Sequence, residues 1–519
     1  MVDNKQKILW IDDEINLLKP HIQFLENKGF QVISSYSAVE AIELLKKEQV
    51  DLIFLDEQMP GVSGLESLDQ ITELAPGTPV IMVTKSEEEN MMEDAIAAKI
   101  SDYLIKPVKP NQLLLSIKKH LHSGRLITQK VQSDFQKAFL DIGNYISEAQ
   151  SFEDWNSIYR DLVRWELELT KSGESGMSEF LENQFNEANT EFAKFIQNNY
   201  TSWFTGNKEG KPMLSPEVLQ KSVFPHVDDG EQVVLFIIDN LRYDQWRTML
   251  SYITPYYYLD KETFYYSILP PTTQYARNSL FSGLMPYEIS KMYPDLWVNE
   301  TQEEGKNIYE EQLFQNHLNR LGKKYSHSFI KIQNLNEGDK LLKNYSKILN
   351  SQLSVVVINF IDLVSHAKTD TRMIRELASD EAAYLSLTES WFIHSTVYEV
   401  MKQLSSRDIR VIITTDHGSI RVKAPVKVIG DRTTSTNLRY KTGKNLQYRK
   451  KDVFAVSNPE KVHLPSEFVS SEYIFAKNDQ FFVYPKNYHY YVNYYHDTLQ
   501  HGGISLEEII VPYVELRPR

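Results

Sequence analysis

Short apolar runs alternate with amphipathic stretches through the first 122 residues. The runs KILWID, QVISSY, DLIFLD, VIMVT and DYLIK are each followed by a stretch with one apolar and one polar face. Such alternation indicates a parallel sheet with helices on both of its faces. Ligands of such sheets bind at the carboxyl ends of the strands. The pattern therefore predicts a doubly wound α/β domain over residues 1–122.

Apolar residues at helical spacing replace this alternation over residues 123–200. They run from Phe135 to Ile146, from Trp155 to Trp165 and from Phe180 to Ile196, and the breaker SGESG separates the second group from the third. This spacing predicts a small helical bundle whose aromatic stripes form its core. The next stretch, residues 201–228, contains three prolines and is expected to be a linker.

Longer apolar runs rich in β-branched residues mark the last part of the chain. VVLFIID, VVVINFID and RVIITTDH occupy residues 233–239, 355–362 and 410–417. Runs of this kind are typical of strands that are buried on both faces of a parallel sheet. We therefore predict a second α/β domain over residues 229–519. A chain of 519 residues is long enough for two or three domains.

Charge and composition narrow the class of protein. A formal net charge of −14 argues against general binding to long duplex DNA. The absence of cysteine excludes disulfides and thiolate zinc sites. No apolar run approaches the ~20 residues that span a bilayer, and the segment MVDNKQKILWIDDE lacks the apolar stretch of a signal peptide. We expect a cytoplasmic protein without membrane contact.

The strand ends of the first domain carry three carboxylates, a hydroxyl and an amine. These are Asp12, Asp13, Asp56, Thr84 and Lys106. Clustered carboxylates repel one another unless a hard cation binds, and Mg²⁺ prefers oxygen ligands. A carboxylate can also accept a phosphoryl group. Lys106 supplies positive charge, and a cis bond between Lys106 and Pro107 would aim it. The plainer interpretation is a doubly wound domain whose acidic strand ends have no special role.

With these residue types at these strand ends, residues 5–120 resemble the receiver domain of response regulators. The resemblance implies that a sensor histidine kinase supplies a phosphoryl group, that Asp56 accepts it, and that the phosphorylated chain forms a homodimer. It further implies an Mg²⁺ site formed by Asp12, Asp13, Asp56 and the Gln58 carbonyl. The residues that respond to phosphorylation would be Thr84, Tyr103 and Lys106.

Acids and histidines at strand ends form a second constellation in the last domain. The three apolar runs end in acids, His417 directly follows the last acid, and two further histidines lie nearby: Asp239, Asp362, His366, Asp416, His417 and His501. Two glycines after the last histidine would let the chain pass close to a ligand. Carboxylate and imidazole without thiolate suit Zn²⁺ or Mn²⁺. Six such ligands divide naturally between two ions, which could together clamp a phosphoryl transfer.

A nucleophile is expected where a helix begins after a further strand. The segment TFYYSILPPTTQYARNSLFSG predicts a strand, two prolines and then a helix over residues 273–282. The free N–H groups of a helix start favour an anion, and metal coordination would activate a threonine hydroxyl there. An ordinary threonine N-cap is the plainer alternative.

These motifs resemble the alkaline phosphatase superfamily, specifically its PglZ-type branch. The matching segments are IIDNLRYDQW, LPPTTQYARNSLFSG, FIDLVSH, TTDHG and HGGISLEEIIVP. The resemblance implies two metal sites and a threonine nucleophile. One site has Asp239, Thr273, Asp416 and His417, and the other has Asp362, His366 and His501. Thr273 is the nucleophile, with Thr272 in reserve. Arg242 and Arg277 flank these positions and could bind phosphate oxygens, or could pair with structural carboxylates.

The order of domains resembles a group of Bacteroidetes response regulators that is associated with type IX secretion and with a partner sensor kinase. We predict that phosphorylation at Asp56 controls a two-zinc phosphodiesterase that acts on oligonucleotides or cyclic nucleotides. The basic stretch 439–451 could contact phosphates and the aromatic stretch 481–495 could stack bases, although a solvated loop and core packing are the plainer readings. The alternatives are a phosphomonoesterase, or a catalytically idle regulator that binds protein, a sigma factor or promoter DNA.

Overall fold

The computed structural model describes residues 5–519 except 86–99, 122, 173–175, 206–209, 300–304, 306, 333–336, 371–377, 379, 432–433 and 469. The chain divides into two compact units, Met1–Ser133 and Asp134–Arg519, which are described one at a time. None of the helices in the described part combines the length and the apolar character needed to cross a bilayer.

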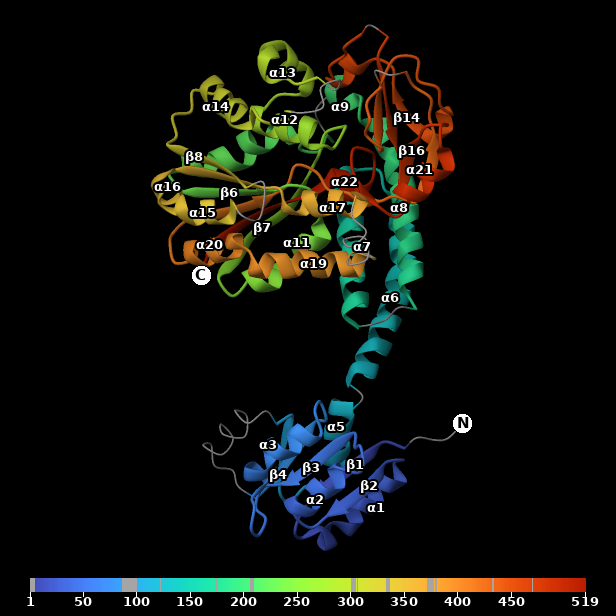
Figure 1. Cartoon of the computed structure of the whole chain (residues 1–519), viewed down its shortest axis with the longest axis vertical. Coiled ribbons are helices and arrows are strands. Elements are labelled where there is room, and N and C mark those ends of the chain that lie inside the picture. The colour runs from blue at the N-terminus through green and yellow to red at the C-terminus, as the bar shows by residue number, and fades with distance from the viewer. Residues whose placement is uncertain are drawn as a thin grey trace. The chain divides into compact units, whose positions relative to one another are not determined.

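The first unit is built on a five-stranded parallel sheet with the strand order β2-β1-β3-β4-β5 (Figure 1). The strands are β1 (Lys7–Ile11), β2 (Gln31–Ser35), β3 (Leu52–Asp56), β4 (Val80–Thr84) and β5 (Asp102–Ile105). The helices are η1 (Ile15–Leu18), α1 (Lys19–Asn27), α2 (Ala38–Leu45), α3 (Gly64–Leu74) and α5 (Pro110–Leu121).

Successive residues of β1 serve two different cores, because side chains alternate across a strand. Leu9 packs with buried residues of α2 and α3, whereas Trp10 packs with buried residues of α1 and α5. Helices therefore cover both faces of the sheet, and the predicted doubly wound domain is confirmed.

Three long helices, α6 (Ser123–Glu148), α7 (Phe152–Ser172) and α8 (Ser178–Asn199), follow this sheet in the chain. The boundary between the two compact units falls within α6. Most of the predicted aromatic stripes are buried, and the rings of Trp155 and Phe192 meet edge to face at 5.4 Å. Phe180 differs from this pattern, since 53% of it is exposed. The predicted helical region is confirmed.

The stretch predicted as a linker, residues 201–228, folds into short helices. They are α9 (Ser202–Thr205), the 3-10 turn η2 (Ser215–Glu217), the π turn η3 (Leu219–Val223) and α10 (Phe224–Asp228). Pro216 and Pro225 lie in the first turns of their helices, where a missing N–H costs nothing. Val218 and Val223 are fully buried. The prolines that suggested a linker therefore begin helices within a packed segment.

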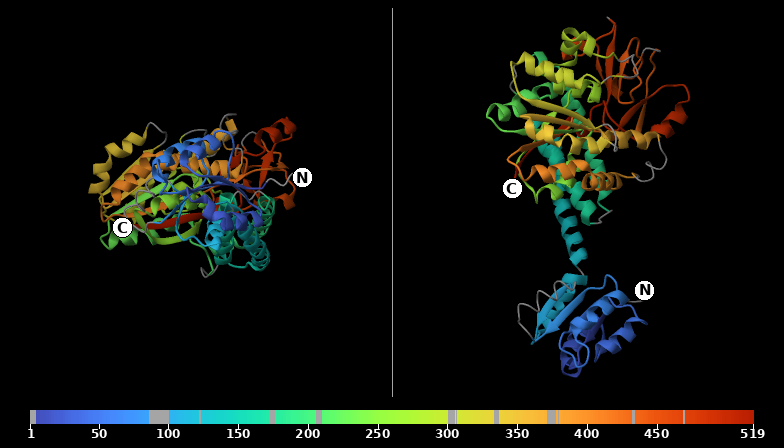
Figure 2. Two further views of the ribbon diagram at one scale, coloured as in Figure 1. Left: turned by 90° about the horizontal axis from the view of Figure 1, so that it is seen from below. Right: turned by 60° about the vertical axis from the view of Figure 1, so that its left-hand side comes forward.

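A six-stranded sheet with the order β7-β18-β10-β6-β9-β8 forms the centre of the second unit (Figure 2). Its strands are β6 (Val233–Ile238), β7 (Tyr257–Tyr266), β8 (His327–Ile332), β9 (Leu353–Ile358), β10 (Arg410–Thr414) and β18 (Ile510–Pro518). Strands β8, β9, β6 and β10 pair in parallel, and β18 pairs antiparallel with β10 and β7. Strands β6, β9 and β10 are buried throughout, which explains their continuous apolar sequences.

Helices lie on both sides of this sheet, with α12 to α14 on one side and α11, α19 and α20 on the other in Figure 1. In chain order the helical elements are α11 (Tyr243–Ile253), η4 (Thr273–Arg277), α12 (Asn278–Ser282), α13 (Pro286–Met292), η5 (Pro294–Leu296), α14 (Glu310–Arg320), α15 (Gly338–Lys343), α16 (Tyr345–Asn350), α17 (Phe360–Asp370), α19 (Glu381–His394), α20 (Thr396–Leu404) and α22 (Leu506–Ile509).

Three small sheets and one helix lie between β10 and α22 in the sequence. Strand β11 (Ile420–Arg421) pairs with β17 (Leu499–Gln500), and β12 (Ala424–Lys427) pairs with β16 (Gln480–Val483). The third sheet has the order β13 (Tyr440–Gly443), β15 (Glu472–Ala476) and β14 (Val453–Val456). The helical elements are η7 (Lys450–Asp452), η8 (Pro459–Val462) and α21 (Tyr488–Tyr495). We call residues 420–500 the insertion.

Candidate functional site

Three carboxylates meet at the carboxyl edge of the five-stranded sheet. One oxygen each of Asp12, Asp13 and Asp56 lies within 4.8 Å of the others. Lys106, which follows β5, places its Nζ 2.8 Å from Asp12 and 2.9 Å from Asp56, and its peptide bond to Pro107 is cis as predicted. Burial raises the pKa of Asp56 and the negative charge of Asp12 adds to this, although Lys106 opposes both. A set of three carboxylates and one amine fits a bound Mg²⁺.

The predicted switch residues lie next to this acidic site. The hydroxyl of Thr84, at the end of β4, donates a hydrogen bond to Glu57 at 3.1 Å. Tyr103 is half-buried against the core that contains Leu9, and Gln58 is exposed directly after Glu57. Glu57 was not selected from the sequence, although an acid directly after a strand-end aspartate was a visible signal.

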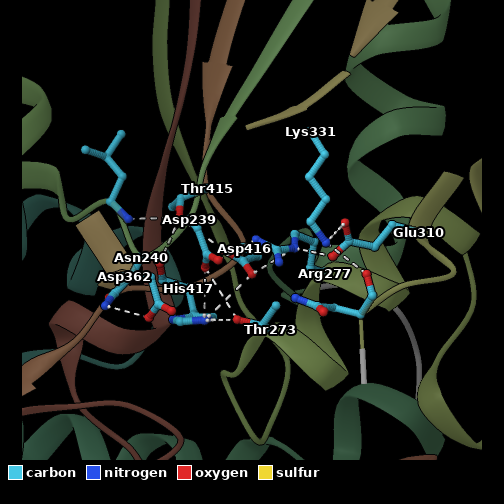
Figure 3. A network of polar contacts seen from close by, with 12 residues as sticks. Asp239, Asn240, Thr273, Arg277, Glu310, Lys331, Asp362, Thr415, Asp416 and His417 are labelled. Atoms are coloured by element: carbon cyan, nitrogen blue, oxygen red, sulfur yellow. Dashed lines mark hydrogen bonds and ion pairs between the residues drawn. The ribbon is translucent and has the colours of Figure 1, made fainter. Parts of the chain in front are cut away.

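Two ligand clusters adjoin at the carboxyl edge of the six-stranded sheet. Asp239, Asp416 and His417 form the first, with ligand atoms within 4.8 Å of one another. These residues follow β6 and β10, which pair in parallel, so that their ends coincide. Thr273 begins η4, and its Oγ1 lies 3.2 Å from His417 Nε2 and 3.4 Å from Asp239 Oδ1 (Figure 3).

The second cluster consists of Asp362, His366 and His501. Asp362 lies in the first turn of α17, and His366 follows it by one helical turn, with Nε2 3.5 Å from Asp362 Oδ2. The rings of His501 and His417 stack at 4.3 Å, which joins the two clusters. Asn240, directly after Asp239, donates to Asp362 Oδ1 at 3.3 Å. The structure therefore brings all seven predicted zinc-site residues together.

Burial and neighbouring charges shift the pKa values of the groups in both clusters. Burial raises the pKa of Asp362 to about 6 and that of Asp416 well above its usual range, and in both cases the negative charge of Asp239 adds to the effect. Burial also raises the pKa of Asp239, but Arg277 and His417 outweigh it and the pKa is lowered overall. Burial lowers the pKa of His417 and His501, which keeps both rings neutral.

One buried ligand atom tests whether a metal fits. Asp416 Oδ2 has no hydrogen-bond partner in the described part of the chain. Arg277 Nε lies 3.8 Å from this oxygen, and the neutral His417 ring places Nε2 3.7 Å from it. An unpaired buried carboxylate oxygen costs free energy, and a divalent cation would remove that cost. The oxygen and imidazole donors fit Zn²⁺ or Mn²⁺.

A buried chain of charges supports the first cluster from behind (Figure 3). Arg277 is fully buried, and its Nη1 lies 2.6 Å from Asp239 Oδ2, whereas Asp239 Oδ1 faces Thr273. Arg277 Nε lies 2.7 Å from Glu310 Oε1, and Lys331 Nζ lies 2.9 Å from Glu310 Oε2. Arg277, expected to bind phosphate or to pair with a structural carboxylate, takes carboxylate partners. Such outer contacts orient metal ligands.

Arg242, the other predicted phosphate-binding residue, begins α11 and is 4% exposed. In the part of the chain that the structure describes, its ion pairs are with Asp244 and with Glu381 at 2.7 Å. Here again the alternative of a carboxylate partner describes the observed contacts.

The basic and aromatic stretches of the insertion divide between core and surface. Arg439 is fully buried with its Nε 3.1 Å from Glu508, and Lys441 is 1% exposed. Lys450 and Lys451 are exposed. Phe481 and Phe482 are buried, whereas Tyr490 and Tyr491 of α21 are 64% and 37% exposed. Only part of each stretch is therefore available to a substrate.

Three family models match successive parts of the chain. A response regulator receiver domain matches residues 8–118, a PorX response regulator linker domain matches residues 125–204, and a BREX system PglZ alkaline phosphatase-like domain matches residues 218–516. The last covers more than half of the 519 residues, and the chain belongs to the family of PglZ alkaline phosphatase-like proteins. With a receiver domain and a PorX linker before it, the chain has the architecture of PorX-like response regulators.

Individual relatives match the receiver region. The alginate biosynthesis transcriptional regulatory protein AlgB of Pseudomonas putida is 38% identical over 124 residues, 24% of this chain and 28% of that protein. The transcriptional regulatory protein ResD of Bacillus subtilis is 35% identical over 115 residues, 22% of this chain and 48% of ResD. The chain thus spans less than half of the length of each.

A CheY-like receiver domain from Methanospirillum hungatei JF-1 is 31% identical, with a TM-score of 0.23, and covers 23% of this chain and 96% of its own. Receiver domains bind Mg²⁺ and are phosphorylated by histidine kinases, and alkaline phosphatase-like domains are metal-dependent.

Proposed function

We propose that the chain is a response regulator in which phosphorylation of Asp56 controls a two-zinc phosphodiesterase. In the receiver domain, Asp12, Asp13, Asp56 and the Gln58 carbonyl hold Mg²⁺, and a sensor histidine kinase supplies the phosphoryl group. Thr84, Tyr103 and Lys106 respond to it, and the chain forms a homodimer. The contacts of Lys106 with both Asp12 and Asp56 support this assignment.

In the hydrolase domain, one Zn²⁺ or Mn²⁺ belongs to Asp239, Thr273, Asp416 and His417, and the other to Asp362, His366 and His501. When bound, such ions supply positive charge that stabilises a phosphoryl transfer. Thr273 is the nucleophile: its Oγ1 bonds to phosphorus as the bond to the leaving oxygen breaks, and water then cleaves the new ester. The position of Thr273 Oγ1, 3.2 Å from His417 Nε2 and 3.4 Å from Asp239 Oδ1, carries the proposal.

The contacts of Thr272 favour its neighbour as the nucleophile. Thr272 is 5% exposed, and its Oγ1 has no hydrogen-bond partner among the described residues. Its methyl group lies beside Gly502, where an added Cβ would come within 3.1 Å of it. Thr272 therefore packs against Gly502 of the HGG segment, whereas Thr273 faces the proposed metal ligands Asp239 and His417.

Oligonucleotides or cyclic nucleotides are the substrates that the surface of the insertion favours. A phosphodiester carries only one negative charge, which two divalent cations more than neutralise. The rest of such a substrate therefore needs a binding surface of its own. Exposed Lys450 and Lys451 offer charge for further phosphates, and exposed Tyr490 and Tyr491 offer rings for bases. The PorX-like order of domains supports a role in the control of type IX secretion.

Metal analysis followed by paired kinetic assays tests this function. The purified protein should bind two zinc ions per chain, and the His501→Ala variant should bind one. Values of kcat/KM should be higher for a short oligonucleotide and for bis-(4-nitrophenyl) phosphate than for 4-nitrophenyl phosphate. A faster monoester would identify a phosphomonoesterase, and metal binding without any turnover would identify an idle regulator.

A further inference from the structure

A cavity of about 630 Å³ lies where helices of the PorX linker region meet the hydrolase domain. Residues of α7 and α8 line it together with residues of α11, α19, β11 and α22, and the helices among these are labelled in Figure 1. Its apolar lining from α7 and α8 consists of Tyr159, Val163, Leu169, Leu181 and Phe185. The volume is in the range of small-molecule sites. None of the proposed metal ligands lines it.

Carboxylates outnumber cations in this cavity by eight to three. The three cations already have partners: Arg242 pairs with Asp244 and Glu381, Arg421 with Glu381 at 2.8 Å and Asp497 at 3.5 Å, and Lys423 with Glu182. The cavity therefore has more carboxyl groups than cations, and each of its three cations has a carboxylate partner at the wall.

Two of the remaining carboxylates lack a cationic partner among the residues that the structure describes. The side chain of Glu166 (α7) has neither a hydrogen bond nor an ion pair within that part of the chain, and only its backbone carbonyl accepts, from Thr170 Oγ1 at 2.7 Å. The Glu507 carboxylate (α22) accepts from the Asn189 amide at 3.1 Å. Burial raises the pKa of Glu166 well above its usual range and that of Glu507 to about 6. Within the described part of the chain, each of these half-buried carboxyls thus lacks an opposite charge of its own, which is unfavourable.

The wall of this cavity is also the back of the metal-ligand turn. Gly418 directly follows His417, and its carbonyl oxygen lies 3.1 Å from His417 Nδ1. A Cβ added at Gly418 would meet the backbone oxygen of Glu507 at 2.1 Å and Arg242 Cγ at 3.3 Å. Two lining residues thus touch the turn that carries a proposed ligand, so a shift of either would be felt at His417.

We propose that this cavity binds a small organic cation, an amine or guanidinium with an apolar body, as an effector of the metal centre. The cationic group pairs with Glu166 and Glu507, and the apolar body packs on the side chains of α7 and α8. A bare metal ion would leave the apolar lining unused, and an anion would face five more carboxyl groups than cations. The binding step is independent of the proposed function, whereas the effector step rests on the proposed zinc centre.

Calorimetry on the full-length protein at constant ionic strength tests the binding step. The probes are 2-phenylethylamine and 1,4-diaminobutane, and the neutral analogues are 2-phenylethanol and 1,4-butanediol. We expect saturable binding of at least one amine, one per chain, and none of its alcohol. Glu166→Gln and Glu507→Gln should each weaken binding by about tenfold or more, whereas Glu168→Gln, at an exposed position of α7, should not.

Glu166→Gln replaces a half-buried carboxyl that has no cationic partner among the described residues, so its melting temperature without a probe should equal or exceed that of the wild type. No saturable binding of either amine, or equal affinity in Glu166→Gln, would overturn the site. Zinc titrations with and without the bound amine test the effector step. A change in zinc affinity that Glu166→Gln abolishes supports it, and an unchanged affinity overturns it. Zinc titration of the wild type alone reports separately on the metal centre.

Discussion

Two acidic centres lie at the carboxyl ends of parallel strands in this chain, and they balance their charge in different ways. In the receiver domain, Lys106 contacts Asp12 and Asp56 directly at 2.8 Å and 2.9 Å. In the hydrolase domain, Arg277 contacts Asp239 at 2.6 Å, but Asp416 Oδ2 has no hydrogen-bond partner in the described part. The receiver site thus contains a cation that contacts two of its carboxylates, whereas Asp416 of the hydrolase site presents a buried oxygen that a divalent cation would pair with.

The two centres also differ in the group that takes the phosphoryl. In the proposed function, Asp56 is a carboxylate that a kinase phosphorylates, whereas Thr273 is a hydroxyl that attacks a phosphate ester. Removal of the hydroxyl in Thr273→Val, which preserves side-chain volume, should lower kcat for a diester by on the order of 10³-fold or more. Steady-state assays with zinc-loaded protein measure this. Thr272→Val should have a much smaller effect, and the reverse ranking would move the nucleophile to Thr272.

The second prediction concerns the pH dependence of zinc binding at the hydrolase centre. The pKa of Asp362 is raised to about 6, so below that pH a proton and a metal ion compete for the same carboxylate. Loss of this proton should therefore raise zinc affinity by up to about tenfold per pH unit until about pH 6, and the contribution of Asp362 should then level off. Competition titrations with a chelator between pH 5 and 7.5 measure the slope. A flat profile would contradict the charge balance described here.

Several of the proposed ligands were predictable because they lie at or just after the ends of buried strands. Asp239 and Asp416 follow β6 and β10, so that an apolar run and its terminal acid locate them without any tertiary information. The same holds for Asp56 at the end of β3. Partners from distant segments were not predictable: Glu310 lies 33 residues from Arg277 and belongs to an amphipathic helix, where an acid is expected on any solvated face.

The observed partners of Arg242 and Arg277, the two predicted phosphate-binding residues, could not be predicted from the sequence for the same reason. Arg242 finds Glu381 across 139 residues, a pairing that depends on how α19 packs. The prolines of residues 201–228 are a second example, since proline marks both a linker and the first turn of a helix. Local sequence patterns predicted the positions of the proposed metal ligands, whereas tertiary packing determines which charged groups the two arginines pair with.

The support behind Asp239 offers a finer test of the comparison. Glu310→Gln should loosen Arg277 and thereby Asp239, and lower zinc affinity by about tenfold, in the range measured for outer contacts of metal sites. The glutamine oxygen can still accept from Arg277 Nε, and the melting temperature checks that the fold persists. Glu311→Gln, an exposed neighbour on α14, is the matched control. Equal zinc affinity in both variants would reduce Glu310 to a packing role.

The smallest expected effect concerns the receiver switch. Beryllofluoride with Mg²⁺ should double the mass of the wild-type protein by light scattering and leave Asp56→Ala unchanged. Thr84 donates to Glu57 at 3.1 Å, and that hydroxyl must leave Glu57 to reach a phosphoryl group on Asp56. Because one hydrogen bond contributes about 0.5–1.5 kcal/mol, Glu57→Ala should lower the beryllofluoride concentration needed for half-maximal dimer by about threefold. Glu73→Gln, at an exposed position of α3, controls for the lost charge. An unchanged or higher midpoint in Glu57→Ala would show that Glu57 does not restrain Thr84.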